Sequence, residues 1–376
     1  MAAVELLENN GAIVYTGAGW SNTVDANASS GSFQVDQTVN DYATVTGAMR
    51  ACYVNMSPTL ADGYFNVSVD GGAVTNQLMG GHGKNLRQYK TLFPAQRNLD
   101  GNSHAVKLSV GVNAFNCTLD SVFLVTGNKI TLTTGNVFHI GDSIALGQGA
   151  WNAQNGYARQ ACCQLQAILG RPLTLTNSMS VTGQQLVGFS GAGAAKGCSL
   201  QIAQAIVAGT FNPEFLFIGP FGTNDLTGFN SFNGGVDLYL RNLYNLLCFV
   251  EDTIDTSSVT VVVSTPPFCG PTITYSHMMA GGSPSTLNLT TGTRQYESGV
   301  VGCANIVRMF PRMKLANVYG AMNRRIDLLY PSNTNDYAHP NDMGHAVIAN
   351  ELISAALGNS TEVGSVINVG GGRGGF

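Results

Sequence analysis

The chain has 376 residues, of which 44% are hydrophobic and 11% charged, and its formal net charge is −4 at pH 7. This length favours two domains over one, and the apolar content is ample for globular cores, which argues against a disordered protein. The slightly negative net charge does not indicate a nucleic-acid-binding protein, which is usually basic, and the apolar runs are too short to span a membrane. We therefore expect neither nucleic acid nor a membrane as a partner.

The amino terminus carries neither a basic segment nor a long apolar one, so no secretory signal is visible in it. The low charge and the abundance of Gly, Asn, Ser and Thr are nevertheless typical of extracellular or virion-associated β-rich proteins, and we expect one of these two locations. A homo-oligomer or attachment to a larger particle is open. The eight cysteines show no metal-ligand spacing, so we expect no metal. Most are interpreted as small buried residues, with a Cys52–Cys117 disulfide as an alternative.

Residues 1–128 are predicted to form an all-β domain, a jelly-roll-like sandwich. Short runs with alternating apolar residues recur, separated by Gly, Asn and Asp at the spacing of a sandwich. These runs are SFQVDQTV, YATVTGAM, ACYVNMS, YFNVSVDGG, HAVKLSVGV and LDSVFLVTG, and the VDGG at 69–72 is typical of a hairpin turn. A polar connector follows at 129–136.

Residues 137–360 are predicted to form an α/β domain, a three-layer doubly wound parallel sheet, because continuous apolar strands alternate with amphipathic helices. The expected strands are NVFHIG, LTLTNS, EFLFIGP, SVTVVVSTPP and MKLANVY, and the expected helices are 156–169, SLQIAQAIVAG, VDLYLRNLYNLLCFVED and MGHAVIANELISAAL. The Gly/Ser/Thr-rich segment 270–290 is long enough to be a functional loop. Residues 361–376 are expected to be a Gly-rich tail. Sheets of this kind carry their sites at the carboxyl ends of the strands.

Three candidate site residues follow successive strands of this domain. Ser143, in HIGDSIALG, is either a turn or helix-capping residue or a nucleophile. Gly183, in TNSMSVTGQQL, is either a simple loop glycine or a place where a backbone N–H approaches a substrate oxygen. Asn224, in IGPFGTND, either belongs to a polar turn or donates its amide to an oxyanion hole.

Asp336 and His339 are three residues apart in NDYAHPNDMGH, so one tight turn could place both on the same side. Asp336 could then orient the imidazole of His339, and His339 could accept the proton of Ser143. The alternative for His339 is a loop or capping histidine. His345 lies inside the helical pattern and His139 inside a strand, and both are interpreted as structural.

The motifs GDSI, SVTG, GTND and DYAHPN together resemble the sequence blocks of the SGNH (GDSL-type) hydrolase family, over about residues 135–358. The resemblance implies that Ser143 is the nucleophile, His339 the general base and Asp336 its orienting carboxylate. It further implies an oxyanion hole made of the Ser143 and Gly183 N–H groups and the side-chain amide of Asn224. The implied reaction is acyl transfer to serine and then to water, which needs no metal or organic cofactor.

The preceding β domain makes the arrangement similar to carbohydrate esterases that carry a jelly-roll module, which predicts O-acetyl esters of a polysaccharide as substrates. Aromatic residues available to stack on sugar rings are Trp20, Tyr53, Tyr64, Trp151 and Tyr157. We select Trp151, Tyr157 and Thr223 as candidate substrate contacts. The composition also resembles bacteriophage tail proteins, some of which carry such esterase domains. Two alternatives stay open: a general or lipolytic short-chain esterase with an accessory β domain, and a non-catalytic glycan- or receptor-binding protein on the same scaffold.

Overall fold

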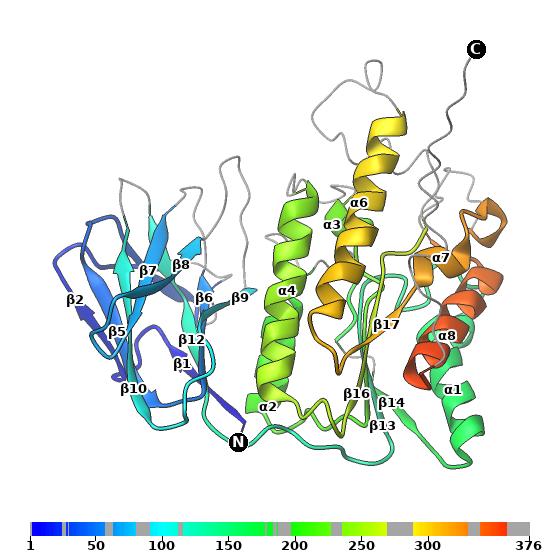
Figure 1. Cartoon of the computed structure of the whole chain (residues 1–376), viewed down its shortest axis with the longest axis horizontal. Coiled ribbons are helices and arrows are strands. Elements are labelled where there is room, and N and C mark those ends of the chain that lie inside the picture. The colour runs from blue at the N-terminus through cyan, green and yellow to red at the C-terminus, as the bar shows by residue number, and fades with distance from the viewer. Residues whose placement is uncertain are drawn as a thin grey trace. The chain divides into compact units, whose positions relative to one another are not determined.

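A computed structural model describes a large part of the chain, with its helices and strands (Figure 1). The described residues are 2–24, 28, 30–56, 63–79, 91–111, 116–176, 179–182, 186, 197–226, 235–268, 289–329 and 339–358. They belong to two compact units: the first comprises 1–136, 183–214 and 228–259, and the second 137–182, 215–227 and 260–376. The predicted loop at 270–290, as far as residue 288, and the predicted tail at 361–376 lie outside the described residues.

The described strand pairs of the first unit are antiparallel. The four-stranded sheet has the order β1 (Ala3–Leu7), β12 (Ser121–Val125), β6 (Ala51–Met56) and β9 (Thr91–Gln96). The five-stranded sheet has the order β2 (Ile13–Thr16), β5 (Tyr42–Ala48), β10 (Ser103–Val110), β7 (Tyr64–Val69) and β8 (Val74–Met79). A three-stranded sheet has the order β11 (Cys117–Leu119), β4 (Ser32–Asp36) and β3 (Ser21–Val24). The described residues of 1–128 thus form strands and no helix, as predicted, whereas the jelly-roll-like sandwich stays a prediction.

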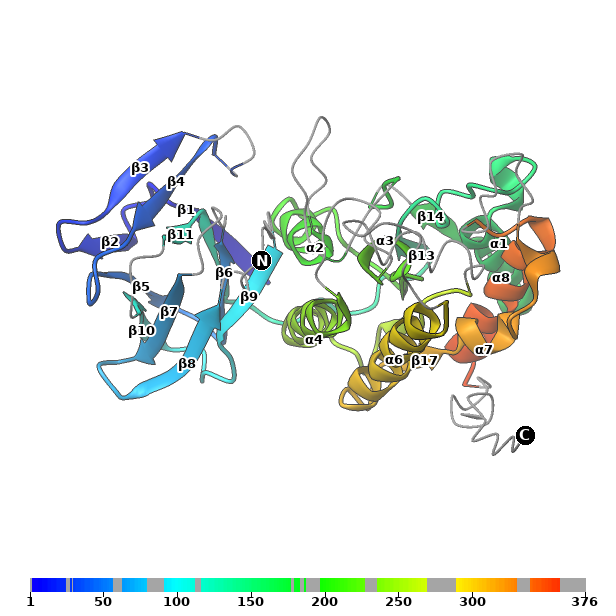
Figure 2. The same ribbon diagram turned by 90° about the horizontal axis from the view of Figure 1, so that it is seen from above.

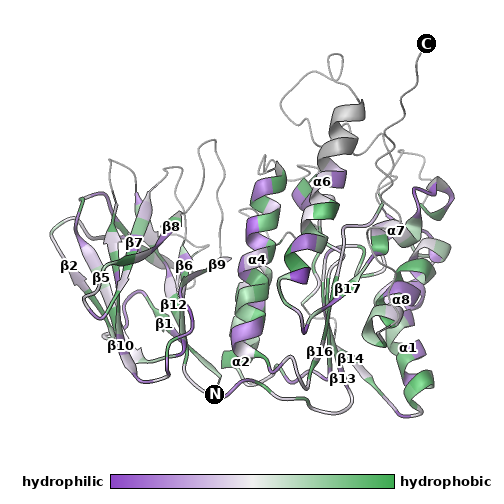
Figure 3. Ribbon diagram, viewed as in Figure 1, coloured by the Kyte–Doolittle hydropathy of each residue, from purple (hydrophilic) through white to green (hydrophobic). Residues whose placement is uncertain are grey.

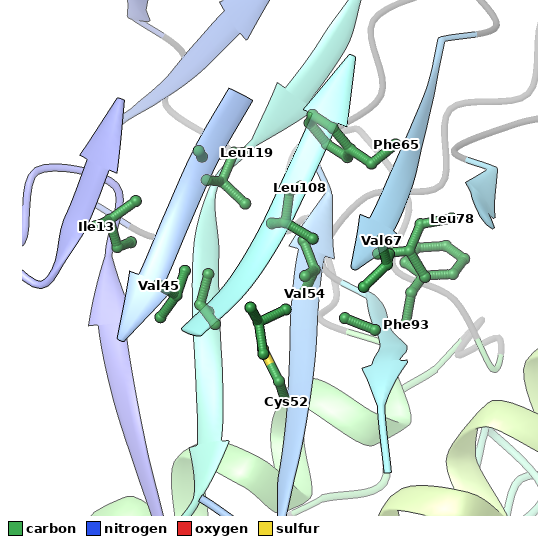
Figure 4. Close-up of a cluster of buried hydrophobic side chains, with 14 of the residues drawn as sticks. Ile13, Val45, Cys52, Val54, Phe65, Val67, Leu78, Phe93, Leu108 and Leu119 are labelled. Carbon is green, nitrogen blue, oxygen red and sulfur yellow. The ribbon is translucent and has the colours of Figure 1, made fainter. Parts of the chain in front are cut away.

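The period-two pattern of these strands produces a hydrophobic core between them. On β10, for example, Val106, Leu108 and Val110 are buried while the residues between them are only partly covered. Side chains from all three sheets join a single buried cluster, and Figure 4 shows Val45, Val54 and Leu108 among its members. The β7–β8 hairpin turns at the predicted place, where Asp70 and Gly71 both have positive φ, as the tight hairpin turn requires.

Two helices that the sequence assigns to the α/β domain lie in the first unit instead. They are α2 (Cys198–Val207) and α4 (Gly235–Thr253), and they contact β1 and β9. Hydrophilic and hydrophobic stretches alternate along α4 (Figure 3). The backbone N–H of Leu92 on β9 donates to Ser199 Oγ on α2 at 3.1 Å. The division of the chain therefore differs from the predicted single boundary near residue 136, because these helices pack against the strands.

The second unit is built on the predicted parallel sheet. Its strand order is β14 (Thr174–Thr176), β13 (Asn136–Ile140), β15 (Phe215–Ile218), β16 (Thr260–Ser264) and β17 (Lys314–Ala316). The β13–β15, β15–β16 and β16–β17 pairs are parallel, and all four residues of β15 are buried, as expected for a sheet covered on both faces.

Helices lie against both faces of this sheet. Figures 1 and 2 show α1 (Tyr157–Leu169) and α8 (Asp342–Ala356) together on one face and α6 (Leu289–Arg308) on the other. Helix α1 ends as predicted, because Gly170 adopts a left-handed conformation with φ 65°. The shorter helices are η1 (Ala153–Asn155), α3 (Thr223–Leu226), α7 (Val318–Met322) and η3 (Ile326–Leu328).

Over the described residues, none of the helices combines the length and the apolar character needed to cross a membrane. Cys52 and Cys117 are buried free thiols, so the alternative disulfide does not form. Burial raises the pKa of each to about 12, and Cys117 Sγ donates to the carbonyl oxygen of Tyr64 at 3.2 Å.

Candidate active site

The side chains of Ser143 and His339 meet beyond the carboxyl end of β13. Ser143 Oγ lies 2.9 Å from His339 Nε2, although the two residues are 196 positions apart in the chain. Ser143 follows β13 directly after Gly141 and Asp142, and His339 lies just before α8. The serine side chain is largely buried, at 6% exposure, whereas His339 is half-buried. A hydroxyl at this distance from an imidazole nitrogen can pass its proton to it.

Ser143 does not cap a helix among the described residues. A series of turns follows it, and helical structure begins only at η1, where the side chain of Asn152 accepts from the backbone N–H of Gln154 at 2.9 Å. Helix α1 begins later still, after Gly156. The helix-cap interpretation of Ser143 therefore fails, and the nucleophile interpretation is left beside that of a plain turn residue.

A fully buried carboxylate, Asp142, lies next to Ser143 and joins it to Asn224. Asp142 Oδ1 accepts from the backbone N–H of Ile144 at 2.9 Å, and Oδ2 accepts from Asn224 Nδ2 at 3.2 Å. Burial, joined by the smaller effect of the Asp225 charge, raises the pKa of Asp142 to about 7 against the lowering effect of the backbone donors. The amide of Asn224 is thus fixed against the residue that precedes Ser143.

Glycine allows the loop after β15 to approach closely enough to place Asn224 there. Gly222 has φ 120°, and a Cβ at this position would lie 2.7 Å from the ring carbons of Pro266. A side chain would therefore be strained and would collide with the neighbouring loop. Asn224 follows two residues later, on the short helix α3, and is buried.

His139 and Tyr157 form a buried hydrogen-bonded chain behind the site. His139 Nε2 lies 2.8 Å from the Tyr157 hydroxyl, and His139 Nδ1 lies 3.2 Å from Ser180 Oγ. The Tyr157 hydroxyl donates to the carbonyl oxygen of Gly219 at 2.8 Å. His139 is thus structural, as interpreted from its place in a strand. The selection of Tyr157 as a substrate contact is wrong, because its side chain is fully buried and its hydroxyl is already bonded.

His345 is also structural, in agreement with the sequence interpretation. It is buried on α8, where Nδ1 accepts from the backbone N–H of Tyr157 at 3.2 Å and Nε2 donates to the carbonyl oxygen of Gln148 at 3.1 Å. Burial lowers the pKa of His345 to about 4, which keeps the ring neutral at pH 7.

The other candidate substrate contacts differ sharply in exposure. Trp151 is 89% exposed and lies on the segment that follows Ser143, whereas Thr223 is buried at the start of α3. In the first unit, Tyr53 is fully buried, and Trp20 is half-buried and stacks on Phe65 with ring centroids 6.3 Å apart. Tyr64 is half-buried, so among the five aromatic candidates Trp151 is the one best placed to meet a ligand from solvent.

Asp336 and Gly183 lie outside the described residues, so the orienting carboxylate and one oxyanion donor stay predictions. Within the described ranges, no group of three or more His, Cys, Asp or Glu side chains is placed to hold a metal ion. The described site thus consists of Ser143, His339 and the pair formed by Asp142 and Asn224.

No protein-family model matches the chain, and no curated protein matches it. Among solved structures, a family two carbohydrate esterase from Cellvibrio japonicus is similar to this chain, at 13% sequence identity and a TM-score of 0.34. The match covers 93% of this chain and 96% of the esterase chain. A salicylyl-acyltransferase from a tetracycline biosynthetic pathway matches 95% with 98% of its own, at 16% identity and a TM-score of 0.39. A protein described as a GDSL-like lipase, from Parabacteroides merdae, matches 61% with 99% of its own, at 19% identity and a TM-score of 0.41.

The structural neighbours are thus family two carbohydrate esterases and GDSL-like, SGNH-type hydrolases, at low sequence identity. With identities and TM-scores this low, the function is inferred from the chemistry of the site itself. The bacteriophage tail origin gains no support from these neighbours and stays a prediction.

Proposed function

We propose that the protein is a serine esterase that hydrolyses O-acetyl and other short-chain esters through an acyl-enzyme on Ser143. The observation that carries this proposal is the 2.9 Å approach of Ser143 Oγ to His339 Nε2. In the first step His339 takes the hydroxyl proton while Oγ attacks the ester carbonyl, and His339 then protonates the departing alcohol. In the second step His339 deprotonates a water molecule that attacks the acyl-enzyme, and it then returns this proton to Ser143 Oγ as the carboxylic acid leaves.

The negative charge that develops on the carbonyl oxygen needs donors already in place. We assign this role to the backbone N–H groups of Ser143 and Gly183 and to the amide of Asn224. The bond from Asn224 Nδ2 to Asp142 supports the assignment, because it fixes the plane of an amide whose nitrogen carries two hydrogens. Asp336 is proposed to orient His339 and to stabilise the imidazolium that forms during the reaction.

The proposed substrate is an acetylated polysaccharide. Support comes from Trp151, whose exposed indole on the segment after Ser143 offers a rigid apolar face for a sugar ring. The strands of the first unit are proposed to be a jelly-roll-like sandwich that serves as a carbohydrate-binding module. Action on such a polymer fits a protein located outside the cell or on a virion, and a phage tail is one such setting.

The esterase proposal is tested by replacing Ser143 with alanine and measuring hydrolysis of an activated acetyl ester. We expect Ser143→Ala to abolish turnover, while Ser298→Ala, at an exposed serine on α6, retains it. Mass spectrometry of the wild type after rapid quenching should find one added acetyl group on the peptide that contains Ser143. Unchanged hydrolysis by Ser143→Ala would disprove the mechanism and favour the non-catalytic binding protein.

The substrate proposal needs separate measurements. Acetate release should be compared over a panel of acetylated bacterial and plant polysaccharides, and rates on aryl esters should be compared from acetyl to long acyl chains. We expect acetyl esters to react fastest and at least one polysaccharide to be deacetylated. A preference for long acyl chains would instead favour the lipolytic alternative.

A further inference from the structure

The segment that follows Ser143 is attached to the segment that follows His339 by several contacts. The two segments pack closely at Gly149, which has φ 93°: a Cβ added there would lie 2.3 Å from the carbonyl oxygen of Pro340 and 2.8 Å from Cβ of His339. No side chain fits in this space, so the two backbones touch. The position of the base relative to the nucleophile therefore depends on how this junction is held.

Asp342, three residues after His339, holds the junction with both of its carboxylate oxygens. Oδ1 accepts from the backbone N–H of Trp151 at 2.8 Å, and Oδ2 accepts from Asn155 Nδ2 at 3.0 Å. Asp342 is half-buried in the first turn of α8; its bond to Asn155 is partly buried, whereas its bond to the backbone of Trp151 is exposed. Both partners are donors, and a carboxylate supplies two acceptor oxygens at this place, whereas an amide supplies only one.

Hydrogen bonds of His345 make the same connection one helical turn later. His345 bonds to the carbonyl oxygen of Gln148 and to the backbone N–H of Tyr157. Residues 342 and 345 lie on the same side of α8, because side chains three apart are neighbours on a helix. The start of α8 is thus bonded to the chain on both sides of Trp151.

We propose that Asp342 is a positioning residue of the esterase: it sets the approach of His339 to Ser143 and holds the backbone of Trp151 in place. The inference rests on the proposed function of Ser143 and His339. It follows because proton transfer between two irregular segments requires their relative position to be fixed closely, and a displacement of about 1 Å can cost on the order of 100-fold in rate. Asp342 acts through His339 and Trp151.

The first test replaces Asp342 with asparagine, which removes one of the two acceptors and turns an N–H₂ group towards a donor. With a small acetyl ester as substrate, we expect kcat to fall about 10- to 100-fold with little change in KM, because the ester contacts are kept while the proton transfer is misaligned. The matched control is Asp327→Asn, at an exposed aspartate of η3 that pairs with Arg325, and its kcat should stay at the wild-type value.

A rescue variant separates positioning from a general effect on α8. In Asp342→Asn combined with Asn155→Asp, the new amide donates to the new carboxylate while its oxygen still accepts from Trp151 N–H, so both bonds return. The charge in the first turn of α8, which itself stabilises a helix, is not restored. We expect kcat to recover in the double variant, and Asn155→Asp alone to be impaired, because it faces two carboxylates towards each other.

The outcomes decide between the possibilities. A kcat for Asp342→Asn that equals that of Asp327→Asn overturns the inference, as does a folded double variant without recovery. If Asp342→Asn does not fold, Asn155→Ala takes its place, because it removes only the hydrogen bond between Asn155 and Asp342. It should lower kcat at unchanged KM, and an unchanged kcat overturns the inference. Ser143→Ala is assayed alongside. If it hydrolyses the ester at the wild-type rate, the proposed function fails. If Ser143→Ala is inactive while Asp342→Asn is fully active, only the positioning role is refuted.

Discussion

The fully buried carboxylate of Asp142 accepts a hydrogen bond from the amide of Asn224 beside the proposed nucleophile. A buried carboxylate is costly unless it accepts hydrogen bonds, and Asp142 accepts from Ile144 N–H and from Asn224 Nδ2. Asn224 therefore contributes to the stability of the turn that holds Ser143 as well as, in our proposal, to the oxyanion hole. The two contributions are separable by experiment, because one affects unfolding and the other affects turnover.

We predict that Asn224→Ala lowers kcat for an activated acetyl ester on the order of 100-fold or more, since one oxyanion donor is lost. The free energy of unfolding should fall by about 1–3 kcal/mol, because a buried acceptor on Asp142 loses its partner. The measurements are steady-state kinetics and urea unfolding, with Asn305→Ala on the exposed side of α6 as the control. Near-normal turnover in Asn224→Ala would remove this residue from the oxyanion hole.

At the scale of single residues, the sequence predicted the members of the site that carry distinctive chemistry. Ser143 and His339 were selected from their motifs, and the structure places them 2.9 Å apart. Tyr157 was misassigned, because an aromatic residue at the start of a helix has the same pattern whether it faces the core or a ligand. Asp342 was missed, because an acidic residue in the first turn of a helix is ordinary helix chemistry and its partners are 187 and 191 residues away.

Helix α8 is the element on which the geometry of the site depends most. It begins just after His339, and its buried His345 bonds to the segment that contains Gln148 and Tyr157. Since Nδ1 of His345 accepts a backbone N–H, a proton added there would place two donors face to face. Burial lowers the pKa of His345 to about 4, and the hydrogen bond to Gln148 and the charge of Asp342 oppose this shift without cancelling it.

This pKa predicts the direction of a pH effect on stability. Well above pH 6.5 His345 is neutral in both the folded and the unfolded state, and its full contribution to stability is present. As the pH falls towards about 4, the unfolded state takes up a proton that the folded state refuses, so the free energy of unfolding drops, by at most roughly 3 kcal/mol. We expect His345→Asn, followed by urea unfolding between pH 7 and pH 4, to lose less stability over this range than the wild type.

The control for this experiment is His104 in the first unit, where the effect has the opposite sign. Asp70 and Asp100 bond to its ring and raise its pKa, so its protonation stabilises the folded state at acid pH. His104→Asn should therefore lose more stability than the wild type on acidification. If His345→Asn and the wild type showed the same pH dependence, the buried neutral state of His345 would be disproved.

For the helices and strands, hydrophobic periodicity predicts well whether a segment is a helix or a strand, and less well which sheet a helix packs against. The β-strands of the first unit alternate clearly, and helix α1 carries an apolar face that the sequence displays, whereas α8 buries a wide face that includes the polar residues His345 and Glu351. The membership of α2 and α4 could not be deduced, because an apolar helix face shows that a helix packs but not against which sheet. In the structure, contacts to β1 and β9 decide this.

At the scale of the whole molecule, an ion cluster shows why the first unit is not continuous in sequence. Arg97, just after β9, donates from Nε to Asp252 Oδ2 at 2.7 Å and from Nη2 to Glu251 Oε2 at 2.8 Å, and both acids lie on α4. The hydroxyl of the buried Tyr53 on β6 also donates to Asp252, at 2.5 Å. A fragment that ends near residue 136 would leave these groups without partners, so the strands of this unit require a helix from a distant part of the chain.

The strength of this connection can be measured because the chain has two tryptophans, Trp20 in the first unit and Trp151 in the second. In a Trp151→Phe background, Trp20 fluorescence follows unfolding of the first unit in urea. We predict that Arg97→Met lowers the free energy of unfolding of this unit by about 2–4 kcal/mol, because Asp252 keeps the Tyr53 hydroxyl but loses its cationic partner at a place where the Arg97 and Asp252 side chains are only 18% and 12% exposed.

The comparison is Arg325→Met, read through Trp151 in a Trp20→Phe background. Arg325 also pairs with an aspartate, Asp327, but the two side chains are 53% and 55% exposed, so water screens the pair and its loss should cost less than about 1 kcal/mol. Methionine keeps most of the aliphatic volume of arginine at both sites, so the difference between the two variants reports the lost charge interactions. Equal, small shifts in both variants would mean that α4 is held to the strands by its apolar face alone, and that the Arg97 cluster contributes no more than a surface ion pair.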